Sequence, residues 1–82
     1  MIVGLASRIH DVVADEAGVE HAALGFTDDL TVDHGIDDLD LMKIAMRLEE
    51  MFGVEVSDDA LQRERTVAQC VELVCEGIVP AA

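Results

Sequence analysis

Apolar residues recur at intervals of three and four positions over residues 2–16, which is the spacing of one face of an α-helix. Polar side chains such as Arg8, Asp11 and Asp15 fill the positions between them. Gly18 follows the last periodic residue, and a glycine there is typical of a helix end. The pattern therefore predicts a first helix that stops before Gly18 and whose apolar face is formed by Ile2, Leu5, Ile9, Val12 and Val13.

Residues 37–51 give the clearest helical pattern in the chain. Asp37 is suited to the N-cap, and Asp38 and Asp40 place carboxylates in the first turn, where the helix dipole favours negative charge. Gly53 marks the end of this helix. We expect its buried face to consist of Leu41, Ile44, Ala45, Leu48 and Phe52.

A long connection, residues 17–36, separates these two helices. It contains three glycines and several turn-forming threonines and aspartates. A loop of this length in a small domain usually has a function or carries its own packing anchors. The expected anchors are Leu24, Phe26, Leu30, Val32 and Ile36.

The last third of the chain predicts two shorter helices. Val54 and Val56 suggest an extended segment, Ser57 suits the start of a short third helix, and Thr66 suits the N-cap of a fourth. The fourth helix would bury Val67, Cys70, Val71 and Val74 and end near Gly77 and Pro80. The pattern predicts an all-α four-helix bundle with a long first loop, in which residues 1–82 form a single domain.

The charge of the chain restricts its partners. The chain contains eighteen acidic residues and five basic ones, and its net charge is −13. Nucleic acids and anionic membranes are excluded as partners because the electrostatic interaction would be repulsive, whereas basic protein surfaces are favoured. The apolar start is too short for a signal peptide, and no stretch is long and apolar enough for membrane insertion. We expect a cytoplasmic monomer.

The cysteines and the aromatic content add two further expectations. Cys70 and Cys75 are five positions apart in one predicted helix, roughly 140° around its axis, so they cannot form a disulfide with each other. Free thiols fit a reducing cytoplasm. Phe26 and Phe52 are the only aromatic residues. The otherwise aliphatic core could open for an acyl chain, or it could be an ordinary small core.

Three segments resemble one known family. Residues 35–41 read Gly-Ile-Asp-Asp-Leu-Asp-Leu, residues 48–56 read Leu-Glu-Glu-Met-Phe-Gly-Val-Glu-Val, and Thr66-Val67 opens the last predicted helix. Asp29-Leu30 is a less specific match ahead of the first segment. In order and spacing these segments are similar to the acyl carrier proteins. That resemblance implies the small acyl-carrier-protein-like four-helix bundle with a long loop between the first and second helices.

The resemblance also implies a prosthetic-group position. In the family, a serine at the start of the second helix is joined to 4'-phosphopantetheine, whose thiol carries acyl chains as thioesters. Asp38 stands at the corresponding position, and a carboxylate cannot form that phosphodiester. As the sequence is written we expect no cofactor, and 4'-phosphopantetheine if residue 38 were serine. The other hydroxyl residues do not replace it; they are Ser7, Thr27, Thr31, Ser57 and Thr66.

Three interpretations of Asp38 stay open. It could be an ordinary first-turn acid that stabilises the helix by about 0.3–1 kcal/mol. It could be an engineered block that keeps a genuine phosphopantetheine-dependent carrier unmodified. It could belong to a natural carrier-like paralogue, in which one negative charge imitates the phosphodiester.

The second helix is the surface that partner enzymes bind in the family, which implies a set of docking residues. Lys43 and Arg47 depart from its usual acidic character, and acids flank them on one helical face, with Glu49 as a further acid. These basic residues could form an ordinary ladder with Asp40 and Glu50, or they could change the choice of partner. The partner-docking residues implied are Asp37, Leu39, Asp40, Lys43, Arg47 and Glu50.

Other constellations are weaker. His34 lies next in sequence to Asp33 and close to Asp37 and Asp38, which could form a loose divalent-cation site or attract cations diffusely. The spacing fits no EF-hand loop, and we assign no metal site. His34 with Asp38 lacks a nucleophile and an oxyanion donor, so no catalytic residue is assigned and an enzyme is not expected. His10 and His21 are expected to be surface residues.

The sequence thus favours a carrier-like docking module of fatty acid, polyketide or aminoacyl transfer metabolism, whose partners would be synthases, ligases and transferases. The alternative is a genuine acyl carrier protein in which Asp38 was substituted for the serine. A metal-dependent or structural protein on the same fold is a third and weaker possibility.

Overall fold

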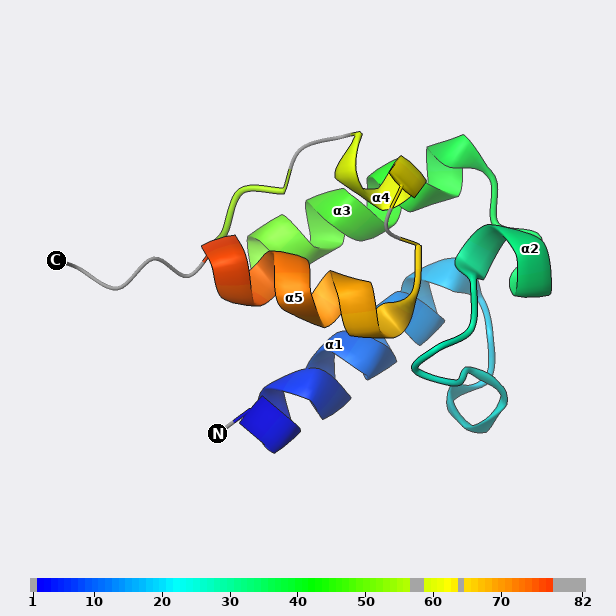
Figure 1. Cartoon of the computed structure of the whole chain (residues 1–82), viewed down its shortest axis with the longest axis horizontal. Coiled ribbons are helices and arrows are strands. Elements are labelled where there is room, and N and C mark those ends of the chain that lie inside the picture. Colours follow the sequence, from blue (N-terminus) through cyan, green and yellow to red (C-terminus); the bar gives the residue numbers. More distant parts are fainter. Residues whose placement is uncertain (1, 57–58, 64, 78–82) are drawn as a thin grey trace, which may run out of the picture.

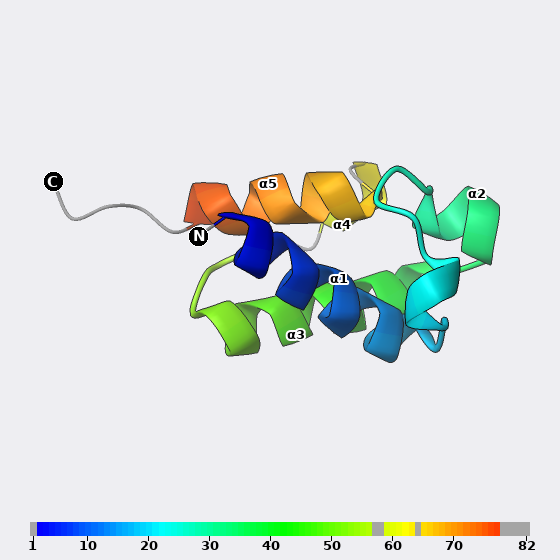
Figure 2. The same cartoon turned by 90° about the horizontal axis from the view of Figure 1, so that it is seen from below.

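The computed structural model describes residues 2–56, 59–63 and 65–77. Three longer helices form the body of the molecule: α1 (Ile2–Ala17), α3 (Asp38–Phe52) and α5 (Val67–Gly77). α1 packs against both α3 and α5, and these two helices also contact each other (Figures 1 and 2). The predicted all-α bundle is therefore confirmed.

Three short elements complete the described chain. The 3-10 turn η1 (His21–Ala23) and α2 (Leu30–His34) lie in the connection between α1 and α3, and α4 (Ala60–Arg63) packs on α3. α2 lies at one end of the bundle, opposite the end where α5 finishes (Figure 1). The expectation of an irregular long loop was wrong for residues 30–34, because this helix of five residues is too short to show a periodic pattern.

Glycine and aspartate end and begin the helices where the sequence predicts it. After α1, Val19 N–H donates to Ala14 O at 2.9 Å and Gly18 N–H to Asp15 O at 3.3 Å. This is the Schellman arrangement, and it needs the left-handed backbone that Gly18 adopts at φ 71°. Gly53 ends α3 in the same backbone region.

The core is aliphatic and is shared by all three long helices. The burial of the expected core residues is confirmed for Ile9, Val13, Leu41, Ile44, Ala45, Leu48, Val67, Cys70 and Val74. Four other expected residues are only partly buried, namely Leu5, Val12, Phe52 and Val71, and the side chain of Ile2 lies outside the description. Of the anchors expected in the connection, Leu24, Leu30 and Ile36 are buried, whereas Phe26 and Val32 are exposed. The largest fully buried side chains are Ile9, Val13, Leu30, Leu41, Ile44, Leu48, Leu61, Val67, Cys70 and Val74.

The C-terminal part holds one tight contact. Gly77 is the final residue of α5, so the expected helix end near Gly77 is confirmed. A Cβ built on Gly77 would lie 2.8 Å from Val54 Cβ, so the close approach of α5 to the segment after α3 requires glycine. Val54 and Val56 are buried and lie outside any helix. The expected helix start at Ser57 and the expected end at Pro80 fall outside the described residues.

Candidate docking face and prosthetic-group position

The start of α3 is fixed by the segment that precedes it. Gly35 ends α2 in the left-handed region at φ 67°, and Ile36 is buried with its N–H donating to Leu30 O at 3.0 Å. Asp37 then caps α3, because its Oδ1 accepts the Asp40 N–H at 2.9 Å. The predicted N-cap is confirmed. Together these contacts set where the first turn of α3 points.

Asp38 is the first residue of α3 and is exposed. Within the described ranges its carboxylate makes no hydrogen bond or ion pair, so the charge faces solvent at the positive end of the helix dipole. Its neighbour Asp37 is occupied as the cap, whereas Asp38 is available to a partner molecule.

The outer face of α3 carries an apolar stripe. Leu39 is 60% exposed, Met46 is 54% exposed and Met42 is 38% exposed. At about 100° per residue, Leu39 and Met46 lie on one line along the helix, roughly opposite the buried face. Apolar side chains held at the solvent side of a helix are typical of a binding surface when they are contiguous.

The charged residues beside this stripe are only weakly engaged. Arg47 Nη1 lies 3.9 Å from Glu50 Oε2, three positions further on. The expected ladder is otherwise wrong, because Lys43 and Asp40 form no ion pair in the part of the chain that the structure describes. Lys43 therefore presents an uncompensated positive charge next to Leu39 and Met46.

Glu49 was interpreted as part of the acidic face, and that interpretation was wrong. Its Oε2 accepts the N–H of Val56 at 2.9 Å, seven residues further along the chain. The carboxylate thus holds the segment after α3 against the helix. Sequence spacing on the helix could not reveal this contact, because Val56 lies beyond the helix end.

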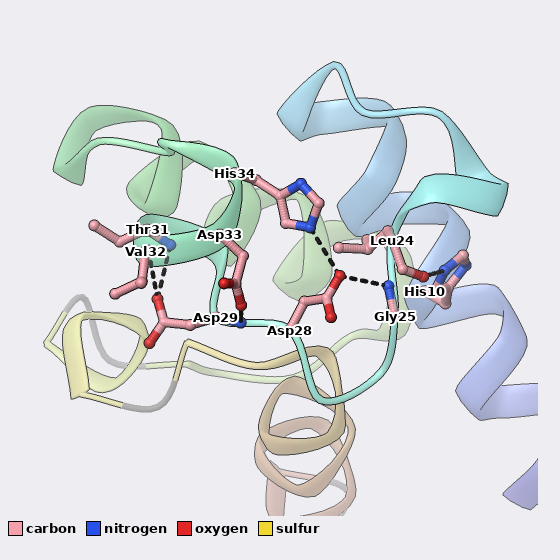
Figure 3. A network of polar contacts seen from close by, with 9 residues as sticks. All are labelled: His10, Leu24, Gly25, Asp28, Asp29, Thr31, Val32, Asp33 and His34. Carbon is pink, nitrogen blue, oxygen red and sulfur yellow. Dashed lines mark hydrogen bonds and ion pairs between the residues drawn. The ribbon is translucent and has the colours of Figure 1, made fainter.

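The acids of the connection are also used inside the fold (Figure 3). Asp29 caps α2 by accepting the N–H groups of Thr31 and Val32, both at 2.9 Å. These bonds, that from Val32 above all, together with the nearby Arg65, hold the pKa of Asp29 below its ordinary value. Arg65 Nη2 lies 3.4 Å from the Asp29 carboxylate.

His34 was placed by sequence near Asp33, Asp37 and Asp38, but its partner is Asp28. The His34 Nε2 lies 2.9 Å from Asp28 Oδ2, which also accepts the Gly25 N–H at 2.9 Å (Figure 3). The Gly25 N–H and then His34 hold the pKa of Asp28 below its ordinary value. Across residues 2–56, 59–63 and 65–77, no three His, Cys, Asp or Glu side chains are placed to hold a metal ion.

None of the hydroxyl residues that the structure describes belongs to the first turn of α3. Ser7 is on α1, Thr27 is exposed in the connection, and the Thr31 Oγ1 is buried. Thr66 caps α5: its Oγ1 accepts the Gln69 N–H at 3.1 Å, and Gln69 Oε1 accepts the Thr66 N–H at 3.2 Å. This reciprocal capping box confirms the predicted start of the last helix.

Comparison with known proteins decides the family. A family model described as "Phosphopantetheine attachment site" matches residues 7–74, which is most of the chain. The chain belongs to the acyl carrier protein family. Members of this family are carriers rather than enzymes, and 4'-phosphopantetheine is their cofactor.

Curated acyl carrier proteins match the chain over most of their own length. The chain is 32% identical to "Acyl carrier protein 2" of Pseudomonas aeruginosa over 74 residues, covering 90% of this chain and 94% of that protein. It is 37% identical to the acyl carrier protein of Trieres chinensis over 68 residues, covering 83% and 85%. For the acyl carrier protein of Solidesulfovibrio magneticus the identity is 33% over 76 residues, covering 88% and 92%.

Two further observations concern the length of the helices and the burial of the cysteines. Within the described ranges, the helices are too short or too polar to cross a membrane. Cys70 is buried and Cys75 is exposed on α5, as expected for residues on different sides of that helix.

Proposed function

We propose that this chain is a carrier-like docking protein of acyl or aminoacyl transfer metabolism that binds pathway enzymes through α3 and carries no phosphopantetheine. In this proposal residues 1–82 act as one domain, and Asp38 occupies the position at which the family attaches its cofactor. The cytoplasmic location, the monomeric state and the fatty, polyketide or aminoacyl nature of the pathway stay predictions.

The observation that supports this proposal is chemical. The family's phosphodiester needs a hydroxyl oxygen, and residues 32–56 contain no serine, threonine or tyrosine. The polar side chains at the start of α3 are all carboxylates, from the capping Asp37, the exposed Asp38 and Asp40. The side chains at this position therefore offer no hydroxyl oxygen to which 4'-phosphopantetheine could be attached.

The outer face of α3 supports the docking half of the proposal. Leu39 and Met46 supply exposed apolar area, and burying it against a partner would be favourable. Asp37, Asp40 and Glu50 keep part of the family's acidic character, while Lys43 and Arg47 add positive charge. We infer a partner site that combines an apolar patch with both basic and acidic groups.

Intact mass tests the attachment half. The chain is expressed together with a broad-specificity phosphopantetheinyl transferase, and its mass is compared with that of Asp38→Ser. We expect no mass gain for the native sequence and the gain of one phosphopantetheine group for Asp38→Ser. A modified native chain would overturn the account of Asp38. A serine variant that also stays unmodified would mean that the transferase no longer recognises the surrounding surface.

The docking half has its own test, which does not depend on attachment. Purified synthases, ligases and transferases of acyl transfer are titrated against the chain, Lys43→Glu and Leu39→Ala by calorimetry. For an enzyme that binds, each substitution should weaken binding about fivefold or more. Val32→Ala is the matched control, because Val32 is 75% exposed but lies on α2. Unchanged or tighter binding of Lys43→Glu would contradict the inferred role of this charge.

The second candidate is a genuine carrier in which aspartate was substituted for serine at residue 38. The capping of α3 by Asp37 supports it equally, because it places residue 38 at the start of the helix, where the family attaches its cofactor. The codon for residue 38 in the native gene separates the two candidates: a serine codon identifies a substituted carrier, and an aspartate codon identifies a paralogue.

A further inference from the structure

Two histidines join α1 to the connection that follows it, and neither is explained by carrier chemistry. His10 projects from α1, and its Nε2 lies 2.7 Å from the carbonyl oxygen of Leu24 (Figure 3). Its Nδ1 lies 3.0 Å from Asp11 Oδ1. The ring also stacks on Phe26, with centroids 5.1 Å apart. The expectation that His10 is a surface residue was wrong, because only 12% of its side chain is exposed.

His21 lies in η1 and reaches back to α1. Its Nε2 is 2.7 Å from Asp15 Oδ1, and its Nδ1 is 3.3 Å from Asp11 Oδ1. Half of this side chain is exposed, as expected from the sequence. The rings of His10 and His21 meet edge to face with their centroids 6.1 Å apart. We call His10, Asp11, Asp15 and His21 the histidine clasp.

The hydrogen-bond partners determine which protonation state completes the clasp. A carbonyl or carboxylate oxygen can only accept, so each ring nitrogen that faces one must carry a proton. His21 places its Nε2 2.7 Å from Asp15 Oδ1 and its Nδ1 3.3 Å from Asp11 Oδ1, so its ring completes both contacts when it carries both protons. In that state one imidazolium charge meets two carboxylates. A neutral ring would turn one lone pair toward an oxygen that also carries lone pairs.

The charges that face the two rings all come from α1 and η1. Asp11 and Asp15 are the carboxylates, and each histidine ring is the other's aromatic neighbour. Within the described residues, no hydrogen bond or ion pair reaches either ring from α3 or α5. The protonation of the clasp therefore depends on these four side chains and on solvent.

The clasp is the main polar attachment of this part of the connection to α1. Leu24 is buried beside it, and Phe26, which stacks on His10, accepts the Ala68 N–H of α5 through its carbonyl oxygen at 2.9 Å. Contacts therefore run from α1 through the connection to the start of α5. Releasing His10 and His21 would loosen both links.

We propose that the histidine clasp is a proton-dependent latch that holds residues 18–28 against α1 while His21 is charged and releases them as the pH rises. The latch is independent of whether residue 38 carries a group. It would make the mobility of the long connection, which leads into the first turn of α3, respond to pH near neutrality.

The sign of the pH effect follows from His21. The hydrogen bond with Asp15 and the attraction of Asp11 raise the pKa of His21 above its ordinary value of 6.5, against a smaller opposing effect of desolvation. A group whose pKa is raised by folding stabilises the folded state below its ordinary pKa. That stabilisation is lost as the pH rises through the raised value. The clasp therefore holds residues 18–28 fully in mild acid, and its hold weakens as the pH rises through the raised pKa of His21.

Amide hydrogen exchange of the full chain, followed by NMR between pH 5.5 and 8.5, tests the latch. Rates at Ala23 and Leu24 are divided by the intrinsic exchange rates at each pH and compared with those at Ile44 in α3. We expect protection at Ala23 and Leu24 to fall about three- to tenfold over this range, relative to Ile44. In the double variant His10→Gln and His21→Gln, protection should already be low at pH 5.5 and change little.

Three single variants sharpen the result. Asp15→Asn removes one carboxylate of the clasp, and Glu76→Gln makes the same charge change at an exposed position of α5. His34→Gln removes a histidine outside the clasp. Only Asp15→Asn should reduce the pH response. An equal response in the double variant, or an equal loss in Glu76→Gln, would show that general charge repulsion and not the clasp is responsible.

A measurement on the native chain keeps the proposal testable even if a variant fails to fold. Ring nitrogen shifts report how many protons each histidine carries. We expect both nitrogens of His21 to be protonated at pH 5.5, and the loss of one proton to coincide with the loss of amide protection. A His21 that lacks its Nδ1 proton at pH 5.5 would overturn the latch.

Discussion

The first turn and outer face of α3 and the connection over residues 18–35 are both rich in acids, yet they use them in opposite ways. In the connection, Asp28 and Asp29 accept backbone N–H groups and pair with His34 and Arg65. On α3, the Asp38 carboxylate makes no hydrogen bond or ion pair within the described residues. The acids of the connection therefore stabilise its own conformation, whereas Asp38 on α3 leaves its charge to solvent.

The largest difference in the free energy of unfolding should appear between substitutions of two leucines, one in each region. Leu30 of α2 is fully buried, whereas Leu39 on the outer face of α3 is 60% exposed. Leu30→Ala should lower the free energy of unfolding by about 2–5 kcal/mol, through lost burial and a residual cavity. Leu39→Ala should change it by less than about 0.5 kcal/mol. Urea unfolding of both variants measures the contrast. An equal loss would mean that Leu39 packs within the fold and is not held for a partner.

The sequence predicted features of these two regions that depend on neighbouring residues, and it missed contacts between residues far apart in the chain. The ends of α1 and α3 followed from Gly18, Asp37 and Gly53, because caps and helix ends are decided within one turn. The contacts of Asp28 with His34 and of His10 with Leu24 were not predicted. Each joins residues that only the folded path of the connection brings together.

The residues of the candidate site were also predicted only in part. Asp38, Leu39 and Lys43 could be named from their places on one helix, and the structure finds all three exposed. Glu49 was assigned to the same surface but is used to hold Val56. Helical spacing gives the side of the helix on which a residue lies. It does not reveal a partner supplied by the chain after the helix ends.

Acid unfolding should separate the carboxylates of the two regions. Backbone N–H donors and the neighbouring cations hold the pKa values of Asp28 and Asp29 below the ordinary value of 3.8. Both groups therefore stabilise the fold above that value, and the stabilisation is lost as the pH falls through the lowered pKa values. Asp28→Asn and Asp29→Asn should flatten the fall of melting temperature between pH 5 and about pH 2.

Asp38→Asn is the control for this pH experiment. It removes a carboxylate that makes no contact within the described residues, so the shape of the acid-side melting curve should be retained. A flattened curve for Asp38→Asn would show that the first turn of α3 also uses its acid to hold the fold. The contrast between the two regions would then fail.

Neighbouring glutamates on α3 give a smaller and more local contrast. Glu49 accepts the N–H of the buried Val56, whereas Glu50 is exposed and lies 3.9 Å from Arg47. Glu49→Ala should lower the free energy of unfolding by about 0.5–1.5 kcal/mol, because the Val56 N–H loses its acceptor. Glu50→Ala should cost between about 0 and 1 kcal/mol, and added salt should diminish that cost. Urea unfolding at two salt concentrations distinguishes them.

The smallest expected effect on stability belongs to Lys43, and its smallness is informative. Lys43 forms no ion pair among the described residues, so Lys43→Gln should change the free energy of unfolding by less than about 0.5 kcal/mol. In a chain with 18 acids and five bases, an ordinary surface cation would be expected to pair with one of its neighbours. A measurable loss on Lys43→Gln that disappears in high salt would restore the ladder with Asp40. No loss would leave Lys43 as a charge without a structural role, which is the result that the proposed docking face predicts.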